Sequence, residues 1–187
     1  MLFENHRKKE KNMSDLIEID EQYQELPENG KIKVLSKNHS LAVGRLSGLL
    51  FNDERFIVMP ELSLDMNQID LSQYGLKAKD ELVPDICLYS EENSIDFSDF
   101  DELKVKQIPL LAIEVLSPQQ EISQIIAKFH AYFALGIKSC WLVTPVTKSI
   151  TIYSQPGKPK TYDINDSELI DEVMDIRLPT QKIFGKR

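Results

Sequence analysis

The sequence predicts a single α/β domain built on a mixed β-sheet that is flanked by helices. Residues 108–144 run as an apolar strand, an amphipathic helix and a second apolar strand. This is the pattern of two parallel strands joined by a helical crossover. Further short strand candidates, with turn residues between them, lie on both sides of this unit and indicate additional antiparallel neighbours. Together these patterns favour a sheet with both kinds of pairing.

Length and composition agree with one globular domain. A chain of 187 residues buries roughly 70% of the surface that its unfolded form exposes. The content of 42% hydrophobic and 28% charged residues is that of a folded domain rather than a disordered chain. The net charge of −8 argues against a protein that coats nucleic acid, because phosphate contacts need Lys and Arg. It does not exclude a nuclease, since a bound metal ion supplies positive charge locally.

The two cysteines and the first residues bear on the cellular compartment. Cys87 and Cys140 lie in apolar runs without the Cys/His spacing of a zinc site, so we expect small core residues in a reducing environment. The N-terminal residues are charged where a signal peptide is apolar, and no apolar run is long enough to span a bilayer. We therefore expect a cytoplasmic protein with no membrane contact.

The first third of the chain contains a charged start followed by helix and strand candidates. We expect a disordered segment over residues 1–12 and a single domain over 13–187, with Met13 as an alternative start. Within that domain, apolar periodicity and turn residues predict an amphipathic segment at 14–26, a strand at 31–36, a helix capped by Asn38 and ending near Leu50, and a strand at 55–62 whose Pro60 marks an end or an edge.

The rest of the chain supplies most of the sheet. We expect irregular structure at 63–80 and an acidic loop at 91–103. Strands are predicted at 82–90, 108–116, 139–145 and 149–154, with weaker candidates at 159–165 and 176–184. A helix is expected to begin at Ser117-Pro118, to end near Leu135 and to be closed by Gly136.

Two acids interrupt the apolar strand patterns. Glu114 lies in IPLLAIEVL, which otherwise has the sequence of a strand covered on both faces. Asp85 interrupts LVPDICL in the same way. A buried carboxylate must be paired, protonated or bound to a metal ion. If the two strands are neighbours, the carboxylates converge, and carboxylate oxygens are ligands that magnesium and manganese prefer.

Lys128 is the third candidate. Helical spacing places it on the flank of an apolar stripe formed by Ile125, Phe129 and neighbouring residues. From there its stem can lie along the sheet while its ammonium reaches a metal site. Such a cation can orient an attacking water or stabilise charge on a phosphoryl transition state.

These residues also carry a family resemblance. The segments PDICLYS, AIEVLSP, AKFHAYFALGIKSCWLV and TIYS resemble the Uma-type restriction endonuclease family, a branch of the PD-(D/E)XK nuclease superfamily. ENGKIKVLSKNHSLAVGRLSGLL is similar to the front segment of that family, including His39. The resemblance covers residues 23–184 and implies a restriction-endonuclease-like fold.

The resemblance also implies an activity and its site residues. It implies a metal-dependent endonuclease acting on nucleic acid, with DNA as the expected substrate and Mg²⁺ or Mn²⁺ as the cofactor. Asp85 and Glu114 match the acidic motifs, and the backbone carbonyl of Val115 is expected as a further ligand. Leu116 occupies the position where the superfamily has its Lys, and Lys128 on the following helix matches the migrated Lys of this family.

Two departures from the family pattern leave open whether a second metal binds. Gln124 and Lys31 stand where many relatives carry acids. His39, Glu61 and Tyr132 are candidates for the border of the site.

Each candidate residue also has a purely structural alternative. Asp85 can be a strand-end residue that hydrogen-bonds near a turn, and Glu114 can be a buried acid paired with a base from elsewhere. Lys128 can be a solvated helix residue, which is the usual case. His39 can be a polar residue near a helix start.

Two other classes of function stay open beside the endonuclease. One is a non-catalytic binding or regulatory domain that has kept the nuclease core. The other is a homodimeric interaction protein whose sheet edges, at 151–154 or 31–36, pair between subunits.

Overall fold

The computed structural model describes residues 36–78, 80–93, 101–118 and 120–186. The sequence-based predictions for 1–12, 14–26 and most of 31–36 lie outside these residues. The elements in chain order are α1 (Lys37–Leu50), β1 (Phe56–Pro60), β2 (Leu64–Asp65), η3 (Leu71–Tyr74), β3 (Glu81–Leu82), β4 (Ile86–Ser90), η4 (Glu91–Asn93), β5 (Leu111–Val115), α2 (Ile122–Leu135), β6 (Ser139–Thr144), β7 (Ser149–Tyr153), β8 (Pro159–Asp163), β9 (Leu169–Asp171), β10 (Ile176–Leu178) and α3 (Thr180–Phe184).

A six-stranded mixed sheet forms the centre of the fold, with strand order β1-β4-β5-β6-β7-β8. β5 and β6 are parallel, in the register Glu114 opposite Leu142, and α2 makes the crossover between them. Every other neighbouring pair in this sheet is antiparallel. The predicted α/β class and mixed pairing are therefore confirmed.

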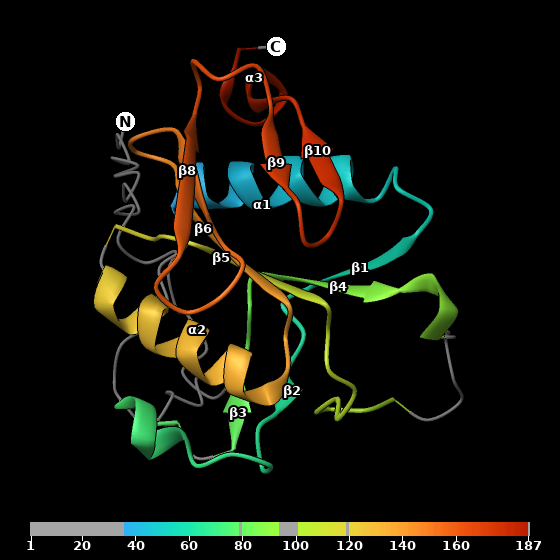
Figure 1. Ribbon diagram of the computed structural model, residues 1–187, viewed down its shortest axis with the longest axis vertical. Coiled ribbons are helices and arrows are strands. Elements are labelled where there is room, and N and C mark those ends of the chain that lie inside the picture. Colours follow the sequence, from blue (N-terminus) through green and yellow to red (C-terminus); the bar gives the residue numbers. More distant parts are fainter. Residues whose placement is uncertain (1–35, 79, 94–100, 119, 187) are drawn as a thin grey trace, which may run out of the picture. The chain divides into compact units, whose positions relative to one another are not determined.

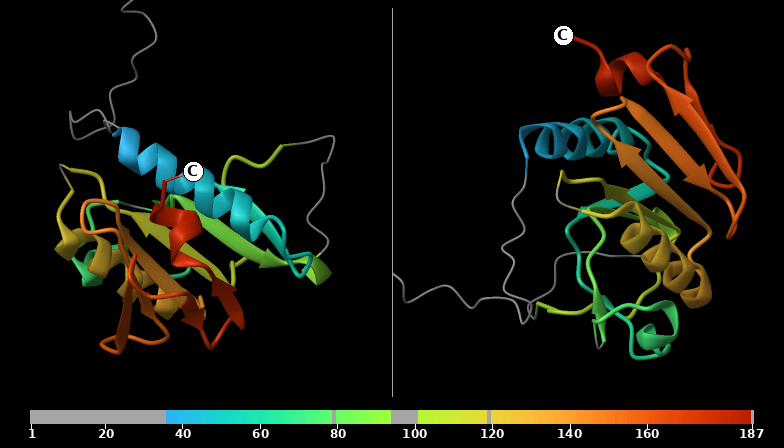
Figure 2. Two further views of the ribbon diagram at one scale, coloured as in Figure 1. Left: turned by 90° about the horizontal axis from the view of Figure 1, so that it is seen from above. Right: turned by 90° about the vertical axis from the view of Figure 1, so that its left-hand side faces the viewer.

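The two faces of the sheet are covered by different elements (Figures 1 and 2). The odd residues of β5, such as Ile113 and Val115, pack with α1, α3, β9 and β10. The even residue Ala112 packs with α2 and the η3 segment on the opposite face. This alternation follows from the two-residue period of a strand, and it places Glu114 on the α2 face.

The ends of α1 and α2 agree only in part with the predicted helix boundaries. Ser36 caps α1, because its Oγ accepts a hydrogen bond from the backbone N–H of His39 at 3.2 Å, so the prediction of Asn38 as the cap is wrong. α2 ends as predicted at Gly136, whose φ of 110° favours glycine. α2 begins at Ile122, four residues later than predicted from Pro118. Before the helix, Gln120 Oε1 accepts a hydrogen bond from the backbone N–H of Ser117 at 3.3 Å.

Proline explains two further differences from the prediction. The strand predicted at 82–90 is broken at Pro84, which has no N–H to donate, so Asp85 lies just before β4 rather than inside a strand. The segment predicted as one strand at 176–184 divides at Pro179 into β10 and α3. Pro60 ends β1, which is an edge strand as predicted.

Two other predictions about the chain fail. Residues 63–80 were expected to be irregular, yet they contain β2 and η3 and bury Leu64, Met66 and Leu71. The 151–154 segment was expected at a sheet edge, but β7 is paired on both sides, to β6 and to β8. None of the helices in the described ranges is both long and apolar enough to cross a membrane.

Candidate active site

Glu114 is buried in β5 and is held by two side chains from α2. Lys128 Nζ donates to both carboxylate oxygens, at 2.9 Å to Oε1 and 2.8 Å to Oε2. Tyr132 Oη donates to Oε1 at 2.8 Å. Lys128 and Tyr132 are one turn apart on α2, so one face of the helix presents both donors to the sheet. The side chain of Lys128 keeps 20% of its surface exposed, whereas that of Glu114 keeps 2%.

Asp85 lies beside Glu114 because β4 begins only at Ile86. The β4–β5 pairing stops at Ile86 opposite Ile113, so beyond this point β5 has no strand neighbour on that side among the described residues. Asp85 Oδ2 fills the gap by accepting from the backbone N–H of Val115 at 2.6 Å. The N–H and C=O of one strand residue leave the strand on the same edge, so the Val115 carbonyl points to the edge where Asp85 lies.

Two residues approach Asp85 from the other side. His39, on α1, places Nε2 at 3.2 Å from Asp85 Oδ1, and both side chains are almost fully buried. The contact has the distance of an ion pair but lacks the alignment of a hydrogen bond. Glu61 donates its backbone N–H to the Asp85 carbonyl at 3.2 Å, but its side chain is exposed. The chain therefore brings Asp85, Glu114, Lys128, Tyr132 and His39 together, while Glu61 contributes through its backbone.

Burial dominates the electrostatics of this cluster. It raises the pKa of the Glu114 carboxyl above its ordinary value, because the charged form is removed from water. The ammonium of Lys128 opposes this rise in pKa, the charge of Asp85 adds to it, and the hydrogen bonds from Lys128 and Tyr132 lower the pKa. The pKa of the Tyr132 hydroxyl is raised well above its ordinary value by burial and by the neighbouring Glu114. Tyr132 is therefore a donor here and not a base.

The donor set fits a hard divalent cation. Asp85 is close enough to Glu114 for its charge to raise the pKa of Glu114, and the Val115 carbonyl lies at the same edge of β5. Carboxylate and carbonyl oxygens are the ligands that Mg²⁺ and Mn²⁺ take. Within the described residues, no three side chains of His, Cys, Asp or Glu converge as a closed metal cage. Magnesium does not require one, since it is commonly held by one or two carboxylates together with water and substrate phosphate.

The hollows of the surface lie elsewhere. One of about 470 Å³ is lined by residues 49–55 and 176–178, and another of about 400 Å³ by residues from 44–52 and 181–186. Neither is lined by the acidic pair. Neither of these two hollows therefore leads to Glu114, whereas the side chain of Lys128, which contacts Glu114, is partly exposed.

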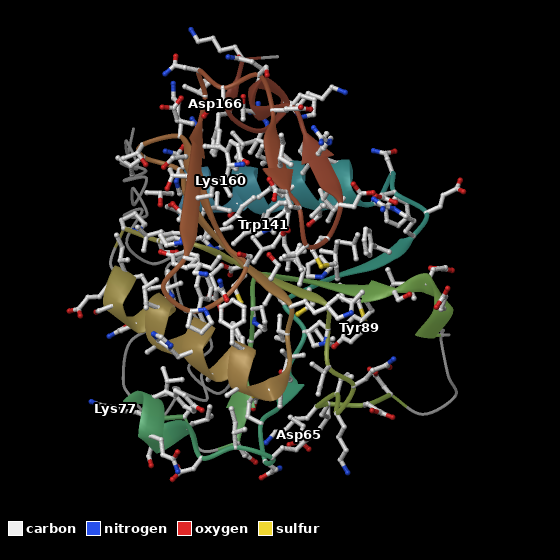
Figure 3. The ribbon with its side chains drawn as sticks, viewed as in Figure 1. Asp65, Lys77, Tyr89, Trp141, Lys160 and Asp166 are labelled. Carbon is white, nitrogen blue, oxygen red and sulfur yellow. The ribbon has the colours of Figure 1, made fainter. Side chains whose placement is uncertain are left out.

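Sequence reasoning missed one buried carboxylate. Asp171, in β9, is 1% exposed and accepts from Ser139 Oγ at 2.6 Å and Trp141 Nε1 at 2.7 Å. It also accepts from the backbone N–H groups of Val173 and Met174. Figure 3 shows Trp141 in the layer that the sheet shares with α1, β9 and β10. The available signal was an acid directly after the apolar pair Leu-Ile in SELIDEVM.

A solved structure shares the fold of this chain. A solved structure described as a "putative nuclease belonging to DUF820", from Anabaena variabilis, superimposes with a TM-score of 0.63. It covers 83% of this chain and 86% of its own, at 16% sequence identity. The fold is thus the restriction-endonuclease-like α/β fold. No curated protein matches the sequence.

The sequence family is more specific than the fold. The profile of the Uma2 family, described as "Putative restriction endonuclease", matches residues 16–180, which is most of the chain. This protein belongs to the Uma2 family. Membership of that family indicates a nuclease-like function.

Proposed function

We propose that this protein is a divalent-metal-dependent endonuclease that hydrolyses phosphodiester bonds, with DNA as its substrate. The observation that supports this best is the meeting of two buried acids from separate segments with one half-exposed lysine. Asp85 Oδ2 is fixed on the end of β5, and Lys128 is fixed on Glu114. Placing two carboxylates in an apolar core costs folding free energy, and a site that binds a cation accounts for that cost.

In this proposal Asp85, Glu114 and the Val115 carbonyl hold Mg²⁺ or Mn²⁺. When bound, the ion polarises the scissile phosphate and lowers the pKa of a coordinated water. Asp85 is oriented for this role by the Val115 N–H, and Glu114 by the Tyr132 hydroxyl. Both carboxylates are thus fixed before the ion arrives, which reduces the entropy lost on binding.

Lys128 is the residue that connects the buried acids to solvent. Without metal, its ammonium neutralises Glu114. With metal and substrate present, the flexible stem lets the ammonium move to the phosphate, where it orients the attacking water or stabilises the added negative charge. The partial exposure of the Lys128 side chain, which is 20% exposed, supports this movement.

The direct test is cleavage of supercoiled plasmid with Mg²⁺, with Mn²⁺ and with chelator. The wild-type protein is expected to cut only with a divalent ion, and Glu114→Gln is expected to be inactive under every condition. Glu172→Gln is the matched control, because Glu172 is an exposed acid near the β9–β10 turn. Equal cutting by wild type and Glu114→Gln contradicts the site assignment. A parallel reaction with single-stranded RNA tests whether the substrate is DNA or RNA.

Assembly and location are further parts of the proposal. We expect a homodimer, because cutting both strands of a duplex commonly uses two sites, and light scattering measures this.

We expect a cytoplasmic protein, which agrees with Cys87 and Cys140 being buried, unbridged thiols.

A non-catalytic binding domain is the second candidate function. The observation that favours it is that Lys128 already satisfies both oxygens of Glu114. A domain that never binds metal needs such an ion pair, and the net charge of −8 suits a partner other than duplex DNA. Absence of Mn²⁺ binding in calorimetry supports this candidate and contradicts the endonuclease.

A further inference from the structure

His39 is a buried side chain that contacts Asp85 but makes no side-chain hydrogen bond with the part of the chain that the structure describes. Its imidazole is about 2% exposed, and neither Nδ1 nor Nε2 has a hydrogen-bond partner among the described residues. Burying an imidazole without hydrogen bonds costs folding free energy. Buried polar groups of this kind are uncommon in folded proteins, and a bound ion is one of the explanations for them.

The position of His39 is fixed by the start of α1. Ser36 caps the helix by accepting the backbone N–H of His39, and the helix packs on the sheet through Ala42, Leu46 and Leu50. The imidazole is therefore carried to the beginning of β4 by a rigid element. There Nε2 lies 3.2 Å from Asp85 Oδ1.

The distance between His39 Nε2 and Asp85 Oδ1 is also close to that between two ligands of one metal ion. Two ligand atoms about 2.1 Å from one ion and at right angles to each other stand about 3.0 Å apart. The His39–Asp85 pair has nearly this spacing, and it lacks the alignment that a hydrogen bond would give. The pair therefore has the separation of two neighbouring ligands of one cation.

We propose that His39 Nε2 is a nitrogen ligand of the divalent ion held by Asp85, so that the site selects Mn²⁺ or Co²⁺ over Mg²⁺. This inference rests on the proposed metal site and adds to it a ligand and a metal preference. Imidazole nitrogen binds later transition ions well, whereas Mg²⁺ and Ca²⁺ favour oxygen, so one nitrogen in the set shifts the preference. Glu114, the other carboxylate ligand proposed for this ion, lies on the α2 side, where Lys128 and Tyr132 contact it.

Pulsed electron paramagnetic resonance of bound Mn²⁺ tests the ligand directly. The chain has three histidines, and His6→Gln with His130→Gln leaves His39 alone. His130 is exposed on α2, so its replacement is a mild change. The double variant is expected to show nitrogen coupling to Mn²⁺, and ¹⁵N-histidine labelling is expected to replace the ¹⁴N pattern with a ¹⁵N pattern. Bound Mn²⁺ without nitrogen coupling overturns the inference.

Calorimetry with single variants separates this inference from the proposed function. His39→Leu is expected to weaken Mn²⁺ binding by about 10–100-fold and Mg²⁺ binding by less, while His130→Gln changes neither. If Asp85→Asn abolishes Mn²⁺ binding but the wild type shows no nitrogen coupling, only the role of His39 fails. If the wild type binds no Mn²⁺, both this inference and the endonuclease proposal fail.

Discussion

Two groups of buried carboxylates lie in this domain, and they are satisfied in opposite ways. Asp171 accepts four hydrogen bonds, all from neutral donors: two side chains of β6 and two backbone N–H groups of its own turn. Glu114 receives its hydrogen bonds from one cation and one hydroxyl, both on α2. Among the contacts of Asp85 within the described residues are a short hydrogen bond from the Val115 backbone N–H and the imidazole of His39.

The difference separates a structural acid from a candidate functional one. The donors around Asp171 belong to strands and a tight turn, so they cannot leave, and they tie the β9–β10 hairpin to the main sheet. The ammonium that contacts Glu114 ends a flexible side chain that is 20% exposed, and in our proposal it leaves Glu114 when metal and substrate bind. Burial alone therefore does not distinguish the two roles, and our proposal rests on the charge and the flexible stem of the donor to Glu114.

The largest expected effect is on stability at Asp171. Asp171→Ala removes the acceptor of Ser139, Trp141 and two backbone N–H groups at once, and each unpaired buried donor costs roughly 1–3 kcal/mol. We expect the free energy of unfolding in urea to fall by at least about 3 kcal/mol. Glu172→Ala, on the exposed turn, is the control, and an equal loss in both variants contradicts the structural role.

The next effect is on catalysis at Lys128. Lys128→Met keeps the length of the stem and removes the cation, so phosphodiester cleavage is expected to fall by about 100-fold or more. Lys138→Met, an exposed change just beyond α2, is expected to leave the rate unchanged. Single-turnover rates at saturating Mn²⁺ measure the difference, and a full rate in Lys128→Met removes this residue from the mechanism.

Glu114 gives a prediction about pH. Its pKa is raised in the folded protein, so the folded state binds more protons than the unfolded state at pH values between the two pKa values. Stability of the metal-free wild type therefore falls as pH rises through this window. Glu114→Gln has no carboxyl to titrate here, so its stability does not fall for this reason. As pH rises, the unfolding free energy of the variant is therefore expected to increase relative to that of the wild type. Denaturant unfolding in chelator over a pH series measures it; a difference independent of pH contradicts the raised pKa.

The smallest expected effect belongs to Tyr132. Tyr132→Phe removes one hydrogen bond, which is worth about 1 kcal/mol of stability. Because that hydrogen bond lowers the pKa of Glu114, its loss raises the pKa, and the acidic limb of the pH–rate profile is expected to move to higher pH. Tyr153→Phe, a half-buried tyrosine elsewhere on the α2 face, provides the comparison. An unmoved acidic limb argues against a positioning role for Tyr132.

The sequence predicted the α2 side of the fold well and the C-terminal third less well. Strong periodicity and long apolar runs locate β5, α2 and β6, and the acids that interrupt those runs locate Asp85 and Glu114. Asp171 escaped notice because β9 is only three residues long, too short to show a period. Lys128, Tyr132 and His39 were predicted at the site or its border, but the acid that each of them contacts follows only from helix packing.

Binding of Mn²⁺, followed by isothermal titration calorimetry, tests the difference between the two acid groups most directly. The wild type and Asp171→Asn, once shown to be folded by circular dichroism, are expected to bind the ion with similar affinity. Asp85→Asn is expected to bind at least about 10-fold more weakly. Equal binding by all three proteins, or no binding by the wild type, contradicts the assignment of Asp85 and Glu114 to a metal site.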